Sequence, residues 1–161
     1  MTYFYKTMKS PVGNLLLIAV DEGLSALLWE GDNLSRIRAK PDIEDINHRI
    51  LKQAEVEINE YFSGIRTSFS VPMVPEGTDF QLSVWEELKK IPYATTISYG
   101  ELAKRIGNPK ASRAVGAANG KNPLSIVVPC HRVIGSSGKL TGFAGGIKVK
   151  SQLLNIEKME K

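Results

Sequence analysis

The sequence predicts an α+β fold with two domains. The N-terminal domain (residues 1–75) is expected to contain a small antiparallel sheet and a helix, and the C-terminal domain (residues 76–161) to be mainly helical with a helix-turn-helix. Short β-rich runs separated by turn residues fill the first 30 residues, and an apolar stripe with helical spacing follows them. Two short helical patterns joined by a tight Asn108-Pro109 turn lie in the second half. A chain of 161 residues is long enough for two small domains that share a core.

The predicted N-terminal sheet contains three strands, at residues 3–5, 15–20 and 24–29. Turn chemistry separates them, because Pro, Gly, Asn and Asp cluster in the intervening segments. Residues 65–71 alternate weakly between apolar and polar side chains and predict one more strand.

A helix is predicted between these strands. Asp42 can cap its start, and Gly64 is a suitable stop. Its apolar residues recur at four-residue steps and form one stripe: Ile46, Ile50, Ala54, Ile58 and Phe62. His48 lies off this stripe, so we expect it to be a solvated surface residue.

Residues 72–77 contain two prolines and a glycine, which indicates the connection between the domains. Thr78 and Gln81 then form a capping-box pattern at the start of a helix that ends at Ile91-Pro92. Trp85 falls on the apolar face of this helix, so we expect it to pack in the core rather than to bind a ligand.

The helix-turn-helix is predicted at residues 98–120. Ser98 and Glu101 form a second capping box, and Gly107 ends the first helix. The second helix consists largely of small residues, namely Ala111, Ser112, Ala114, Gly116, Ala117, Ala118 and Gly120, whereas Arg113, Asn119 and Lys121 are expected to reach outward. A helix of small residues permits close approach of its backbone to another surface, either a nucleic acid or another helix inside the protein.

The last predicted helix, at residues 147–158, buries Val149, Leu153, Leu154 and Ile156. Glu157 lies three and four residues after Leu154 and Leu153, so it shares their inward side. A buried acid needs a partner. Either a Lys or Arg residue or His131 can supply it.

Charge is divided unevenly along the chain. Residues 1–80 carry eight basic and twelve acidic residues, a net charge of −4, and residues 81–161 carry thirteen and five, a net charge of +8. A basic half fits a polyanionic partner, although it also fits a solvated lysine-rich surface. The sequence contains no membrane-spanning run or signal peptide, so no membrane partner is expected.

Cysteine and histidine usage excludes two other kinds of site. One cysteine and two histidines cannot form an internal disulfide or a standard structural zinc site, so no metal and no cofactor is expected. The single cysteine also favours a reducing compartment, which predicts a cytoplasmic protein.

The single cysteine lies in the run Pro129-Cys130-His131-Arg132-Val133. A thiol reacts as the thiolate, which nearby cationic groups stabilise. A lone cysteine is more often a small buried hydrophobic residue, but the adjacent histidine and arginine favour a reactive one.

Together with its flanking residues, this run resembles the active-site signature of the O6-alkylguanine-DNA alkyltransferases, which repair DNA by direct reversal. The resemblance is dense over residues 78–158 and loose over the first 75. Its further motifs keep the expected order and spacing: Phe80-Gln81, Val84-Trp85, Leu88, Ile91-Pro92, Ser98-Tyr99-Gly100-Glu101-Leu102-Ala103, Gly107-Asn108-Pro109-Lys110-Ala111, Arg113-Ala114-Val115-Gly116, Asn122-Pro123, Gly142-Phe143-Ala144-Gly145-Gly146, Lys150, Leu153-Leu154 and Glu157.

The resemblance implies a ribonuclease H-like roll for the N-terminal domain and a stoichiometric, irreversible alkyl transfer to Cys130 from O6-alkylguanine in DNA. In the family, the residue matching Glu157 orients the one matching His131, which draws the thiol proton through a water molecule. Tyr99 matches the residue that donates to guanine N3, although from its type alone it would more often be a core residue. Activity on O4-alkylthymine stays open.

The resemblance also implies how DNA is bound. The small-residue helix enters the minor groove of alkylated double-stranded DNA, and Arg113 fills the space left by a flipped guanine. The other expected DNA contacts are Ser112, Ala114, Gly116, Ala117, Asn119, Lys121 and Arg132. The expected pocket residues are Asn122, Val133, Phe143, Ala144 and Ser125. The protein is expected to act as a monomer.

Three positions depart from the common pattern, because Phe143 replaces a tyrosine and Asn119 and Ser125 are small or polar where some members carry bulkier apolar residues. At Phe143 only the hydroxyl is lost, so aromatic packing on the base survives. Asn119 and Ser125 leave the size range of the substrate open but not the reaction. Two other functions stay open on the sequence. A non-catalytic sensor of alkylated bases would share this fold, although the known non-catalytic relatives lack the cysteine. A cysteine hydrolase would use His131 or His48 as its base and would turn over repeatedly.

Overall fold

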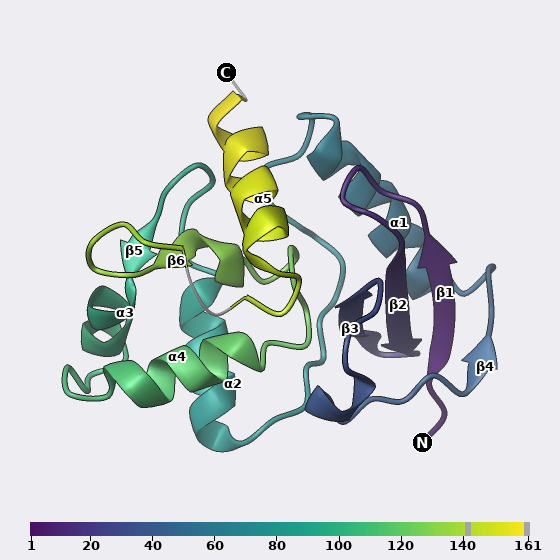
Figure 1. Ribbon diagram of the computed structural model, residues 1–161. Coiled ribbons are helices and arrows are strands. Elements are labelled where there is room, and N and C mark those ends of the chain that lie inside the picture. The colour runs from purple at the N-terminus through teal and green to yellow at the C-terminus, as the bar shows by residue number, and fades with distance from the viewer. Residues whose placement is uncertain (141–142, 160–161) are drawn as a thin grey trace.

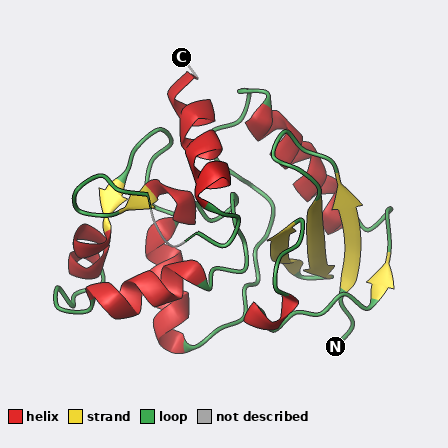
Figure 2. Ribbon diagram, in the orientation of Figure 1, coloured by secondary structure: helices red, strands yellow, loops and turns green. Residues whose placement is uncertain are grey.

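The computed structural model describes residues 1–140 and 143–159 (Figure 1). The N-terminal half contains β1 (Phe4–Met8), β2 (Leu15–Val20), β3 (Gly23–Trp29), β4 (Ile43–Glu44) and α1 (Arg49–Phe62). The C-terminal half contains α2 (Asp79–Leu88), β5 (Ile97–Ser98), α3 (Tyr99–Arg105), α4 (Ser112–Gly120), β6 (Val133–Ile134) and α5 (Ile147–Met159). Short 3-10 helices occupy Leu34–Arg36 and Cys130–Arg132. The predicted α+β fold is confirmed, with most strands in the first half and most helices in the second (Figure 2).

The N-terminal sheet has the strand order β3-β2-β1-β4. β1 and β3 each pair antiparallel with β2, as the turn-separated runs predict. β4 is an additional short edge strand that pairs parallel to β1, so the sheet is mixed rather than wholly antiparallel. α1 packs against β1, β2 and β3 (Figure 1).

The predicted start of α1 is wrong. The helix begins at Arg49 because Asp42 is used elsewhere: its backbone N–H and that of Ile43 donate to Tyr3 O, which builds the β4 edge instead of a helical turn. Ile46 therefore lies outside the helix and is 57% exposed.

His48 is the residue that caps α1, and its predicted surface position is also wrong. Its Nδ1 accepts from Ile50 N, its Nε2 lies 3.0 Å from Asp21 Oδ1, and its ring stacks on Phe4, which leaves only 8% of the residue exposed. An imidazole can thus replace the usual Ser, Thr, Asp or Asn at a helix N-cap.

The strand predicted at residues 65–71 does not form. Its backbone groups are bonded by a side chain instead, because Glu57 Oε1 accepts from both Ser70 N and Val71 N. The chain joins the sheet edge only just afterwards, where Leu24 N donates to Pro72 O and Val74 N donates to Leu24 O.

The helices of the C-terminal half follow the sequence signals closely. Thr78 and Gln81 form a complete capping box at α2, and the Ser98 side chain accepts from Glu101 N at α3. Trp85 is buried and donates from Nε1 to Ala118 O at 2.8 Å, which confirms its packing role and holds α2 against α4. α3 and α4 contact each other as a helix-turn-helix. Each helix of the described ranges is too short or too polar to cross a membrane.

One hydrophobic core extends through both halves. It includes Leu27 of β3, Tyr61 of α1, Trp85 of α2 and Leu153 of α5. The halves are also joined by backbone pairing, since Leu27 N donates to Pro123 O at 2.7 Å and Leu27 bridges to Leu124. β3 of the N-terminal sheet is therefore in direct contact with the segment that leads to the cysteine.

Candidate active site and DNA-binding helix

The only cysteine lies at the end of a buried, irregular segment. The Asn122 side chain shapes this segment, because its amide donates to Val128 O at 2.9 Å and its Oδ1 accepts from Leu124 N at 3.0 Å. Ile126 has a φ of 72°, a left-handed conformation that a β-branched residue rarely adopts. The chain thereby bends and presents Cys130 at the start of a 3-10 helix, with 3% of the residue exposed.

Burial raises the pKa of the Cys130 thiol, so the resting group is protonated. Hydrogen bonding by Asn122 opposes this effect, and so do the positive charge of Lys150 and hydrogen bonding by Ser125. Both predicted pocket residues of this segment, Asn122 and Ser125, are therefore next to the sulfur. Reaction at neutral pH requires a base that removes the thiol proton.

His131 and Glu157 are in direct contact, with 2.6 Å between Nε2 and Oε2, and both are fully buried. Burial raises the pKa of Glu157, but bonding to His131 and Arg132 outweighs it and lowers the value to about 2. An ionised carboxylate only accepts, so Nε2 of His131 carries the hydrogen and Nδ1 keeps its lone pair. Burial lowers the pKa of His131, which keeps the ring neutral. Nδ1 is buried and has no hydrogen-bond partner among the described residues.

Arg132 faces inward, so its predicted place on the DNA-facing surface is wrong. Its Nε and Nη2 donate to the two oxygens of Glu157 at 2.9 and 3.0 Å, and its Nη1 donates to Ile91 O at 2.7 Å. This pairing neutralises Glu157 inside the protein. Both partners that the sequence offered for Glu157, a basic residue and His131, are present together.

The exposed face of α4 carries most of the predicted DNA contacts. Arg113, Ala114 and Ala117 are exposed, as is Lys121 just after the helix, whereas Ser112 and Gly116 are half-buried. Asn119 is buried, and its Nδ2 lies 3.4 Å from Cys130 O, so the expectation that it reaches outward is wrong. It joins α4 to the cysteine segment instead.

Two further predicted pocket residues, Val133 and Phe143, lie around Lys150 together with Tyr99. The Lys150 ammonium is fully buried, donates to Val133 O at 2.6 Å and lies 5.9 and 6.0 Å from the ring centres of Tyr99 and Phe143. Tyr99 is half-buried at the first turn of α3, and Ala144 is exposed. Gly142, which belongs to the matched run, lies outside the described residues. Residues 1–140 and 143–159 contain no group of three or more His, Cys, Asp or Glu side chains able to hold a metal ion.

Comparisons with known proteins match both halves of the chain to one family. Residues 79–159 match the family model of the 6-O-methylguanine DNA methyltransferase DNA-binding domain, and residues 3–75 match that of its ribonuclease-like domain. The chain belongs to this family. A methylated-DNA–protein-cysteine methyltransferase of Methanosarcina acetivorans is 48% identical over 96% of this chain and 97% of its own. The structure of Mycobacterium tuberculosis OGT in complex with DNA is 47% identical, with a TM-score of 0.86 over 98% of this chain and 94% of that one.

The chain is accordingly a DNA-binding methyltransferase that repairs DNA by direct transfer of an alkyl group to a protein cysteine. Beside the residues that the sequence indicated, side chains of the N-terminal half contact the residues around the cysteine segment. Arg36 donates to Asn122 O at 2.9 Å, and Trp29 packs against Phe143 with 5.5 Å between ring centres. A Cβ atom at position 145 would lie 2.8 Å from the Trp29 ring, so only glycine at this position permits the contact between Trp29 and Phe143.

The sequence comparison matched Lys150 but gave it no role, although Lys150, Leu153, Leu154 and Glu157 recur at helical spacing on one face of α5. Arg36 and Trp29 carried no comparable signal. They reach the site through contacts between the two halves of the chain, which no local pattern encodes.

Proposed function

We propose that Cys130 accepts the alkyl group and that each protein molecule reacts once. The contact between His131 and Glu157, one residue away from the only cysteine, carries this proposal. Sγ attacks the alkyl carbon, the S–C bond forms, and the bond from that carbon to guanine O6 breaks. No sequence feature suggests that the resulting thioether could be cleaved again, and the family resemblance implies a single, irreversible transfer.

His131 removes the thiol proton. Its Nε2 is engaged by Glu157, so Nδ1 takes the proton, through a water molecule as in the resembled family. Glu157 then stabilises the imidazolium that forms. The proton lost by the thiol is matched by one gained by the departing guanine, whose charge Tyr99 neutralises through a hydrogen bond to N3.

The substrate is proposed to be double-stranded DNA bound through its minor groove, with the alkylated guanine flipped out. The alkyl carbon is inaccessible within a stacked duplex, so flipping is required. Arg113 projects from the small, exposed residues of α4 and is suited to occupy the vacated space. The charge distribution also supports this docking, because α4 lies in the basic half of the chain.

The flipped base is proposed to lie against Phe143, with the backbone N–H of Ala144 directed at O6. Val133 O already accepts from Lys150, but a carbonyl has a second lone pair that can accept from the exocyclic amine of guanine. Lys150 would thus fix the direction of this carbonyl. Asn122 and Ser125 would hold the sulfur toward the alkyl carbon.

The protein is proposed to act as a cytoplasmic monomer, with the domain boundary between residues 75 and 76. The two other functions receive no specific support. His48 is occupied in capping α1, so it does not supply the base of a hydrolase. A non-catalytic sensor would not need the buried relay beside a nucleophile.

Intact mass after incubation with duplex DNA containing O6-methylguanine tests the proposal. One methyl group per chain, located on Cys130, is expected, followed by no further product. Cys130→Ser should abolish transfer and leave DNA affinity largely unchanged. Product beyond one equivalent of protein, or methyl on any other residue, would contradict the mechanism.

A further inference from the structure

We infer that Tyr61, in the N-terminal domain, is a positioning residue for alkyl transfer that acts through Glu157. The inference rests on the proposed role of His131 and Glu157. The family resemblance gave Tyr61 no role, and the sequence offered it only as one residue of the helix preceding Gly64.

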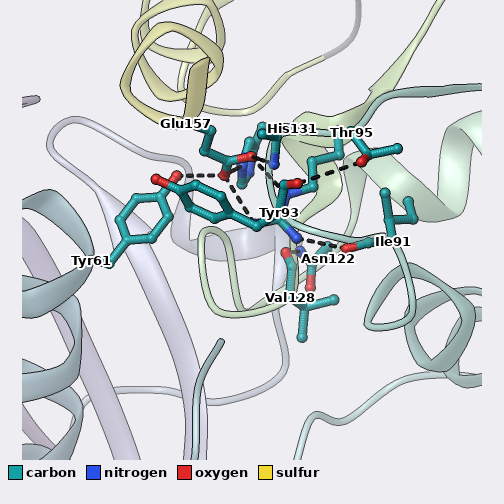
Figure 3. A network of polar contacts seen from close by, with 10 residues as sticks. Tyr61, Ile91, Tyr93, Thr95, Asn122, Val128, His131 and Glu157 are labelled. Atoms are coloured by element: carbon teal, nitrogen blue, oxygen red, sulfur yellow. Dashed lines mark hydrogen bonds and ion pairs between the residues drawn. The ribbon is translucent and has the colours of Figure 1, made fainter. Parts of the chain in front are cut away.

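The Tyr61 hydroxyl is part of the relay itself (Figure 3). It donates to Glu157 Oε2 at 2.7 Å, and this is the same oxygen that receives the hydrogen of His131 Nε2 at 2.6 Å. Tyr61 and Glu157 are both fully buried, so no water competes for the bond. The carboxylate cannot rotate away from His131 without also breaking its contact with Tyr61.

Four chain segments hold this carboxylate. Tyr61 approaches from α1, His131 and Arg132 from the 3-10 helix, and α5 carries Glu157 itself. The fourth is the loop before β5, where Ala94 N donates to Oε1 at 3.0 Å. Ala94 has a φ of 62°, a left-handed conformation that aims its N–H at this oxygen.

Tyr61 is itself fixed by aromatic neighbours. The rings of Phe62 and Tyr93 meet it edge-on, with centres 5.3 and 6.2 Å away, and Phe69 lies at 5.8 Å. Burial is the main reason why the pKa of Tyr61 is raised, and the charge of Glu157 adds to the effect, so the phenol stays protonated and remains a donor. The N-terminal domain therefore presents a rigid O–H to the relay.

The hydrogen bond from Tyr61 to Glu157 matters because it weakens the effect of the Glu157 charge on the pKa of His131. When Nδ1 takes the thiol proton, the imidazolium is stabilised by Glu157 and opposed by Arg132 and Lys150. A third donor on Oε2 makes Glu157 less basic, which holds down the pKa of His131. Removal of the Tyr61 hydroxyl should raise this pKa, and should also loosen the carboxylate. The neutral, active form of His131 would then be lost at a higher pH as the solution is acidified.

Tyr61→Phe tests the inference in the full-length protein. The readout is the single-turnover rate on free O6-methylguanine base as a function of pH, since this substrate needs no flipping. We expect the plateau rate to fall about threefold to tenfold, as loss of one well-placed hydrogen bond implies. The acidic limb of the profile should move to higher pH by about half a unit to one unit.

Phe4→Leu is the control, because Phe4 is an aromatic residue of the same half that packs against the core, stacks on His48 and is not among the neighbours that fix Tyr61. It should lower thermal stability and leave the pH profile in place. In a Glu157→Gln background, Tyr61→Phe should cause no further loss of rate, since the two residues act as one unit. Incorporation of 3-fluorotyrosine at position 61, a stronger donor of nearly equal size, should move the acidic limb to lower pH.

The outcomes distinguish a failure of the inference about Tyr61 from a failure of the proposed roles of His131 and Glu157. If Glu157→Gln keeps the wild-type rate and pH profile, the relay itself is wrong. If Glu157→Gln slows transfer but Tyr61→Phe only lowers stability, as Phe4→Leu does, Tyr61 is merely structural and the inference is wrong. Should Tyr61→Phe fail to fold, an unmoved profile with 3-fluorotyrosine overturns the inference equally.

Discussion

Glu157→Gln should destabilise the protein strongly, because the change removes the carboxylate that pairs with the buried Arg132. The pKa of Glu157 falls from 4.5 to about 2 on folding, and at 1.36 kcal/mol per unit this corresponds to about 3 kcal/mol of stability. Removing one partner of a buried ion pair costs about 3–5 kcal/mol in other proteins, which agrees with this estimate. We therefore expect the free energy of unfolding at pH 7 to fall by about 3 kcal/mol.

The pH dependence follows from the sign of the shift. A carboxyl whose pKa is lowered on folding stabilises the native state above its unfolded pKa, and this contribution is lost as the pH falls toward its folded pKa. The difference between wild type and Glu157→Gln should therefore be complete above pH 4.5 and shrink between pH 4.5 and about 2. Urea denaturation at pH 7, 4 and 3 measures it.

Glu101→Gln provides the matched control. Glu101 accepts from Arg105 at 3.1 Å on the surface of α3, where both side chains are substantially exposed. Such a pair is worth about 0–1 kcal/mol, so this variant should unfold almost like wild type. A loss below 1 kcal/mol for Glu157→Gln, or a difference that does not change on acidification, would refute the reasoning about the buried carboxylate.

Three further variants test the remaining parts of the site. Arg113→Ala should slow transfer from duplex DNA far more than transfer from the free O6-alkylguanine base, and equal losses in single-turnover rate would make Arg113 structural. Phe143→Tyr should change the rate only slightly, whereas Phe143→Ala should cost about 1–3 kcal/mol of transition-state stabilisation on both substrates, since the base stacks on this ring. A large gain from tyrosine, or no loss from alanine, would overturn this account of the pocket. Lys150→Met should raise the pKa of the Cys130 thiol, because it removes a nearby positive charge, and the pH dependence of alkylation by a small reagent measures the change.

Helices whose capping and turn residues are all close in the sequence were predictable. The Thr78 capping box, the burial of Trp85 and the short helices around Asn108-Pro109 follow from turn and capping residues that act within a few positions. The start of α1 was missed because His48, an unusual cap, replaced Asp42. Here tertiary contacts with Asp21 and Phe4 outweighed the local preference.

The site residues that lie close together in the sequence were predictable, and those whose positions depend on long-range contacts were not. Cys130 and His131 are adjacent in sequence, and the helical spacing of α5 placed Glu157 on an inward face. Arg132 was expected to contact DNA from the family resemblance, and Asn119 was expected to reach outward near the end of the small-residue helix. Their inward bonds, to Glu157 and Cys130, are long-range contacts that sequence spacing does not reveal.

The backbone bond from Leu27 to Pro123 has a consequence for how the molecule opens. This bond and the shared core couple the opening of β3 to the opening of the segment that leads to Cys130. Amide hydrogen exchange at Leu27 in β3 and at Val128 before the cysteine should then report the same opening free energy, that of global unfolding. The segment that carries the nucleophile would belong to the slowest-exchanging unit of the protein, although it has no regular secondary structure of its own.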